Sequence, residues 1–186
     1  MQLNTLGVVH EFLRRSVAPG AFCIDATAGK GRDTALLCRL AGPTGRVLAF
    51  DVQPEALRQT QELLDAEDLH NAELILDSHA NMERYAAPES ADAVVFNFGR
   101  LPGGNPAIMT RTDSSLAALD AALRLLKPGG VMALALYYGG ANGYGERDAI
   151  LNWLKDVDAK RFSVLRCDWC NRSGDPPIPV LLWKER

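Results

Sequence analysis

The sequence predicts an α/β fold in which helices cover both faces of a mostly parallel sheet. Short apolar runs alternate with segments of helical periodicity from residue 22 onward, and this alternation is typical of βαβ units. The runs are apolar almost throughout, as expected for strands that are covered on both faces. Near the end of the chain, two strand-like runs follow one another without room for a helix, which predicts an antiparallel hairpin.

Seven strands are expected in this sheet. Five of them should be parallel, because a connecting segment separates each from the next. They cover FCIDAT (22–27), RVLAFD (46–51), AELILD (72–77), ADAVVFNF (91–98) and VMALALYY (131–138). The last two strands, FSVLRCDW (162–169) and IPVLLWK (178–184), should run in opposite directions and form the hairpin.

Helices are expected between these strands and at the start of the chain. One begins at the glycine turn before Arg32 and another just after Pro54, since both signals are common at helix starts. A third covers about 112–126, where apolar residues recur at helical spacing until KPGG ends the helix. A fourth begins near Glu146, and residues 3–18 should form an outer helix.

Composition limits the class of protein. Of the 186 residues, 47% are hydrophobic and 23% are charged, a balance typical of a globular protein that we expect to be a single domain over 1–186. No apolar run is long enough to span a membrane, and the first residues lack a signal-peptide pattern, so we expect a cytoplasmic protein. The net charge of −3 disfavours a dedicated nucleic-acid clamp but allows a local basic patch.

The four cysteines do not indicate a metal site. Cys167 and Cys170 form a CxxC motif, but a tetrahedral site needs further ligands. If the segment is a strand, side chains three residues apart also point to opposite faces of the sheet. Cys23 and Cys38 resemble the small buried hydrophobes that isolated cysteines usually are. We therefore expect no metal.

The stretch DATAGKGRDT (25–34) predicts a ligand site. It follows the first strand, and ligands of open α/β sheets bind at the carboxyl ends of strands. Gly29 and Gly31 would let the backbone approach a ligand, and Asp51 ends the next strand at the spacing that suits ribose hydroxyls. The dinucleotide fingerprint GxGxxG is absent, and Asp33 would repel a pyrophosphate. Alternatively, the glycines only permit a tight turn and Asp33 is a favourable charge at a helix N-terminus.

An acidic loop suits S-adenosylmethionine, which carries a sulfonium cation and an amino-acid tail in place of phosphates. Asp25 would hold its ammonium group directly or through water, and the segment from Ser78 to His79 would flank the adenine. The end of the fourth strand, NFGRLPGGN (97–105), would hold the methyl acceptor. There the Asn97 oxygen would orient an amine, and positioning is most of what such a displacement needs. A structural turn capped by Asn97 is the alternative.

These motifs resemble a known family. DATAGKGRDT, FDVQPEAL, DSHANM, FNFGRLPGG, YYGG and NRSGDPP occur in the order and spacing of the YtqB/MnmM family, long labelled as rRNA methylases, and the resemblance extends from residue 3 to the end. It implies a Rossmann-like class I methyltransferase fold, whose sheet also ends in a hairpin. The family is similar to tRNA-modifying enzymes that methylate the 5-aminomethyl group of wobble uridine, often 2-thiolated, to 5-methylaminomethyluridine.

The motifs and the resemblance together give three sets of candidate residues. Cofactor binding is expected from Asp25, Thr27, Gly29, Gly31, Asp33, Thr34, Asp51, Gln53, Ser78, His79 and Asn97. The catalytic set is Asn97, Gly99, Leu101 and Pro102. Substrate binding is expected from Arg100, Gly103, Gly104, Tyr138 and Asn171.

One position departs from the family pattern. Arg100 stands where the family usually has tyrosine, so a cation that can stack or hold a phosphate replaces an aromatic ring. The tRNA anticodon region is the expected partner, with Arg100, Arg111 and Arg172 as candidate phosphate contacts. Methylation of rRNA or of a small molecule, NAD binding, and a noncatalytic role remain alternatives, and a homodimer is left open.

Overall fold

The computed structural model describes residues 4–99, 111–138 and 143–186. Its first half alternates helices and strands: α1 (Thr5–Ser16), β1 (Phe22–Asp25), α2 (Arg32–Ala41), β2 (Arg46–Asp51), α3 (Pro54–Ala66) and β3 (Ala72–Leu76). A short 3-10 helix η1 (His79–Arg84) then leads into β4 (Ala91–Phe98). The second half contains α4 (Thr112–Leu125), β5 (Leu126–Leu136), α5 (Gly143–Asp156), β6 (Phe162–Arg166) and β7 (Ile178–Lys184).

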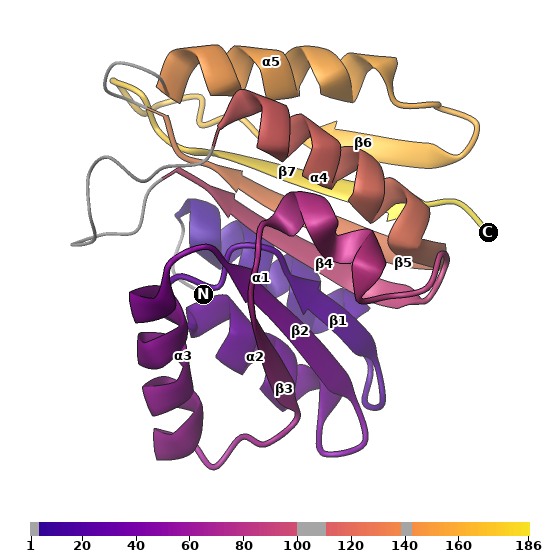
Figure 1. Ribbon diagram of the computed structural model, residues 1–186. Helices are drawn as coiled ribbons and strands as arrows, with labels where there is room; N and C mark the ends of the chain where they lie inside the picture. Colours follow the sequence, from indigo (N-terminus) through magenta and orange to yellow (C-terminus); the bar gives the residue numbers. More distant parts are fainter. Residues whose placement is uncertain (1–3, 100–110, 139–142) are drawn as a thin grey trace.

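The seven strands form one sheet in the order β3-β2-β1-β4-β5-β7-β6. Strands β1 to β5 are parallel, whereas β7 pairs antiparallel with both β5 and β6. The expected parallel sheet with a final hairpin is therefore confirmed. Because the parallel strands share a direction, their carboxyl ends lie at one edge of the sheet (Figure 1).

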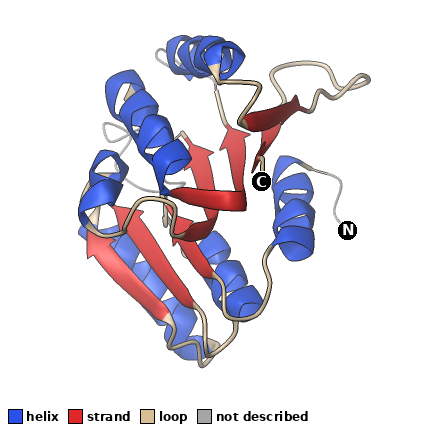
Figure 2. Ribbon diagram, turned by 90° about the vertical axis from the view of Figure 1, so that its right-hand side faces the viewer, coloured by secondary structure: helices blue, strands red, loops and turns tan. Residues whose placement is uncertain are grey.

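Alternate strand residues pack into two hydrophobic clusters, one on each face of the sheet. Ile24 and Val94 belong to the cluster under α4 and α5, whereas their neighbours Cys23 and Val95 belong to the cluster under α1 and α2. Figure 2 shows helices on both sides of the strands. The almost continuous apolar character of these strands follows from burial on both faces.

Five strand boundaries differ from the sequence-based expectation. β1 ends at Asp25, β3 at Leu76 and β5 at Leu136, each one or two residues early, whereas the start of β5 and the end of β6 differ by more. The segment KPGG does not separate α4 from β5, because β5 already begins at Leu126. The register passes from Ala91↔Leu126 to Ala93↔Val131, so the extra residues form a bulge within the strand. The strand β6 stops at Arg166 instead of continuing to residue 169.

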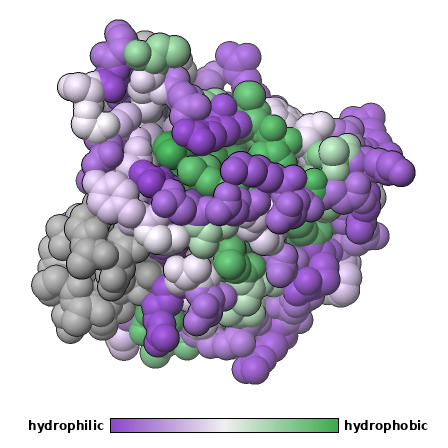
Figure 3. All heavy atoms as spheres, turned by 90° about the horizontal axis from the view of Figure 1, so that it is seen from above, coloured by the Kyte–Doolittle hydropathy of each residue, from purple (hydrophilic) through white to green (hydrophobic). Residues whose placement is uncertain are grey.

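The face of the molecule in Figure 3 is mostly hydrophilic. Viewed from above, apolar groups lie in small patches between hydrophilic side chains (Figure 3). Among the larger exposed apolar side chains, Val164 and Leu165 lie on the edge strand β6. Within the described ranges, no helix has the length and apolar character that a membrane span requires.

Candidate active site

The loop between β1 and α2 is held against both neighbouring strands. The Ala26 N–H donates to the Val95 carbonyl of β4 at 2.9 Å, and the Ala28 N–H donates to the Phe50 carbonyl of β2 at 2.8 Å. Gly29 and Gly31 have φ values of +56° and +76°, a backbone conformation that favours glycine. The loop thus places the N-terminus of α2 at the carboxyl edge of the sheet.

Asp51 joins this loop to the end of β2. Its Oδ2 accepts a hydrogen bond from the Gly29 N–H at 3.0 Å, and its Oδ1 accepts one from the Gln53 N–H at 2.9 Å. An ionised carboxylate has about four lone-pair positions, so both oxygens retain the capacity to accept from a ligand. The carboxylate therefore lies where the sequence predicted a ribose-binding acid.

Gly31 has a different local environment from the one expected. A Cβ added to it would lie 2.8 Å from the Thr60 Cα of α3, which is closer than real Cβ contacts. The missing side chain therefore allows α3 to pack against the loop. This contact does not test the expectation that Gly31 lets the backbone approach a ligand, which stays a prediction.

Asp25 stabilises the loop through buried hydrogen bonds. Its side chain is fully buried, and its two oxygens accept from the Thr27 N–H at 3.1 Å and the Thr34 hydroxyl at 2.6 Å. Burial, followed by the nearby Asp33 charge, raises the pKa of Asp25 to about 7. Asp25 was expected to hold the ligand ammonium group directly or through water. Direct contact does not fit a carboxyl group that is enclosed in this way.

Asp33 connects three elements of the fold. It is 3% exposed at the start of α2. Its Oδ1 lies 2.5 Å from His10 Nε2 of α1, and its Oδ2 accepts a hydrogen bond from Asn97 Nδ2 of β4. It is therefore more than a solvated charge at a helix terminus. His10 had no motif or spacing that marked it in the sequence.

Asn97 contributes both a donor and a buried acceptor at the end of β4. Its N–H donates to the Thr27 hydroxyl oxygen at 2.6 Å, and its side-chain amino group donates to Asp33. Its Oδ1 is buried and finds no hydrogen-bond partner in the described part of the chain. A buried acceptor without a partner is uncommon in proteins, and it marks this oxygen as a candidate ligand contact.

His79 presents a second buried acceptor beside the loop. Its Nδ1 lies 3.2 Å from the Ala26 carbonyl, and its Nε2 is buried without a partner among the described residues. Burial lowers the pKa of His79, which favours the neutral ring. With Nδ1–H donating to Ala26, Nε2 can accept a hydrogen bond. The neighbouring Ser78 hydroxyl caps η1 by accepting from the Ala80 N–H.

Aromatic rings and arginines gather beyond the carboxyl end of β5. Tyr138 donates its hydroxyl hydrogen to the Pro176 carbonyl, and the Arg147 guanidinium lies 4.6 Å from the Tyr138 ring centre. Arg172 lies 3.7 Å from the ring centre of Trp169. Tyr138, Trp169 and Arg172 line a cavity of about 220 Å³, together with other residues of the connection between β6 and β7.

Some of the remaining candidate residues lie within the described ranges and others lie outside them. Gly99 has a φ of +143° beside Tyr137, whereas Asn171 and Arg111 are exposed. The expectations for Arg100, Leu101, Pro102, Gly103 and Gly104 lie outside the described residues. Cys23 and Cys38 are buried as expected. No group of three metal-ligating side chains occurs in the described ranges, Cys167 and Cys170 included.

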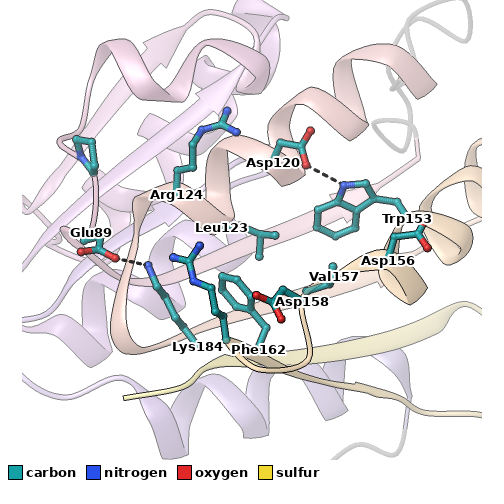
Figure 4. A pocket seen from close by; sticks show the side chains of 12 residues that line it. Glu89, Asp120, Leu123, Arg124, Trp153, Asp156, Val157, Asp158, Phe162 and Lys184 are labelled. Atoms are coloured by element: carbon teal, nitrogen blue, oxygen red, sulfur yellow. Dashed lines mark hydrogen bonds and ion pairs between the residues drawn. The ribbon is translucent and has the colours of Figure 1, made fainter.

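Another cavity lies at the other end of the sheet. It has a volume of about 510 Å³ and is lined by residues of α4, α5 and the start of β6 (Figure 4). The Trp153 indole N–H donates to Asp120 on one side, and Lys184 pairs with Glu89 on the other. Because it lies near the amino ends of the parallel strands, it is separate from the loop and from Asn97.

Comparison with known proteins gives a consistent set of relatives. A family model described as "Putative rRNA methylase" matches residues 47–183. A chloroplastic tRNA (mnm(5)s(2)U34)-methyltransferase of Arabidopsis thaliana is 33% identical over 95% of this chain and 67% of its own length. A ribosomal RNA small subunit methyltransferase H of Verminephrobacter eiseniae is 48% identical, but over 28% of this chain and 16% of its own.

Solved structures of two relatives resemble this protein over nearly its whole length. A crystal structure of a "putative rRNA-methylase" from Clostridium thermocellum has a TM-score of 0.95 and 40% identity, with 99% of each chain covered. A "putative methyltransferase" from Streptococcus mutans, in complex with SAH, has a TM-score of 0.90 and 35% identity, again with 99% of each chain covered.

Proposed function

This chain belongs to the rRNA methylase family, and we propose that it methylates the 5-aminomethyl nitrogen of wobble uridine in tRNA. It is an S-adenosylmethionine-dependent methyltransferase with the expected class I fold. The single observation that carries the choice of an amine acceptor is the buried Asn97 Oδ1, which lacks a partner among the described residues at the end of β4.

The residues beside the loop fit the proposed cofactor. Asp51 offers a carboxylate for the ribose hydroxyls, and His79 Nε2 offers a buried neutral acceptor next to the loop. Asp33 and Asp51 make this region acidic, which favours a sulfonium cation and disfavours a pyrophosphate. Bound S-adenosylmethionine supplies an electrophilic methyl group, and S-adenosylhomocysteine remains after transfer.

Asn97 would orient the nucleophile. An N–H of the neutral acceptor amine donates to Asn97 Oδ1, and this contact aims the nitrogen lone pair at the methyl carbon. The new N–C bond forms as the S–C bond breaks, sulfur keeps the bonding pair, and the methylated nitrogen then loses a proton to water. An amide suits this role because it accepts a hydrogen bond without taking the proton, and the alignment itself accelerates the reaction.

The aromatic residues near Tyr138 support an RNA substrate. Unpaired bases stack on aromatic rings and on arginine guanidinium planes, and Tyr138, Arg147, Trp169 and Arg172 provide both kinds of surface beside the carboxyl edge. With a net charge of −3, we expect only a few phosphate contacts and a modest dependence of RNA affinity on salt.

Methylation of small-subunit rRNA is a second candidate, which the family description and the partial match to methyltransferase H favour. Mass spectrometry of nucleosides separates the two. We expect tRNA from cells without this gene to accumulate 5-aminomethyluridine or its 2-thio form and to lose the methylated product. The purified protein should restore the methyl group to that tRNA. Unchanged tRNA nucleosides with a methyl group missing from small-subunit rRNA would favour the second candidate.

A further inference from the structure

His10 extends the candidate active site to the N-terminal helix. Its Nε2 lies 2.5 Å from Asp33 Oδ1, and the side chains are 20% and 4% exposed. The other oxygen of Asp33 accepts from the Asn97 amino group. Three side chains from α1, α2 and β4 thus form a hydrogen-bond network that ends at Asn97 Oδ1, which has no partner among the described residues.

These hydrogen bonds determine which end of the Asn97 amide faces the acceptor amine. A side-chain amide has a donor end and an acceptor end, and a half turn exchanges them. An ionised carboxylate only accepts hydrogen bonds, so Asp33 binds the amino end and leaves the oxygen for the substrate. The selection depends on a fixed Asp33 carboxylate, and His10 supplies a donor to its other oxygen.

We propose that His10 is a positioning residue for methyl transfer, acting through Asp33 to hold the Asn97 oxygen toward the acceptor amine. This inference rests on the proposed function, because it assumes that Asn97 orients the amine. A purely structural role for His10 is less well supported, since apolar contacts already anchor α1. Val9, Phe12 and Leu13 are buried against the sheet and α2, and the helix should remain in place without the imidazole.

Four proteins test the proposal kinetically: the wild type, His10→Ala, His10→Gln and His70→Ala. His10→Ala should slow single-turnover methyl transfer by about ten- to a hundredfold, with S-adenosylmethionine affinity and melting temperature nearly unchanged. His10→Gln keeps an N–H donor and should recover most of the rate. His70 is the matched control, because its ring contacts Asp68 at 2.8 Å but is 74% exposed and remote from the loop.

Nuclear magnetic resonance of the Asn97 side-chain amide provides a measurement that needs no substrate. Its two N–H signals should shift and lose protection from exchange in His10→Ala, and in Asp33→Asn, but not in His70→Ala. A wild-type rate in a folded His10→Ala, or unchanged amide signals, would overturn the positioning role. If the amide signals change as expected but the wild-type enzyme does not methylate tRNA, the positioning role stands and the proposed substrate is wrong.

Discussion

Replacing Gly31 by alanine tests what this glycine does in the cofactor loop. Its φ of +76° costs an L residue about 1–2 kcal/mol. The new Cβ would also lie 2.8 Å from the Thr60 Cα, and overpacking against a fixed neighbour costs about 1–3 kcal/mol. The free energy of unfolding should therefore fall by about 2–5 kcal/mol.

Urea unfolding of the wild type, Gly31→Ala and Gly20→Ala measures this loss. Gly20 is the control, because it has a φ of +84° but its nearest contact would be Thr44 Oγ1 at an ordinary 3.8 Å. Its substitution should cost about 1–2 kcal/mol. Thr60→Ala should not rescue Gly31→Ala, since the closest atom belongs to the backbone. Equal losses in the two glycine variants, or rescue by Thr60→Ala, would refute the packing argument.

Three further predictions concern the candidate site. Asp51→Ala should weaken S-adenosylmethionine binding by about 1.5–3 kcal/mol in calorimetry, because charge-assisted hydrogen bonds are lost; an unchanged affinity would remove Asp51 from the site. Asn97→Ala should slow single-turnover transfer by about ten- to a thousandfold while cofactor affinity stays nearly constant, and a wild-type rate would argue against its role. Asp25 has a folded-state pKa of about 7 against an ordinary 3.8, so its stabilising contribution is complete below the lower value and is lost as pH rises through the higher one. The free energy of unfolding of the wild type should therefore fall relative to that of Asp25→Asn between pH 5 and pH 8. A difference between the two proteins that is the same at both pH values would contradict this reasoning.

The sequence predicted most of the sheet because short apolar runs, which are local patterns, indicate where strands form. The runs at 46–51, 91–98 and 178–184 match β2, β4 and β7 at both ends. The errors fall where tertiary pairing overrides local signals. KPGG resembles a turn, yet β4 pairs with the residues on both sides of it. β6 ends at Arg166, whose partner is Val180, although β7 already begins at Ile178.

The sequence by itself determined the glycine loop and the acid at the end of β2, since strand ends and turn residues are local features. The acceptor segment after β4 stays a prediction. Only the tertiary structure decided how these groups are connected. It enclosed Asp25, set Gly31 against Thr60 and joined His10 to Asn97 through Asp33. These contacts join residues that are distant in the chain. Periodicity reports which face of an element is buried, but it carries no information on which side chains from different elements meet there.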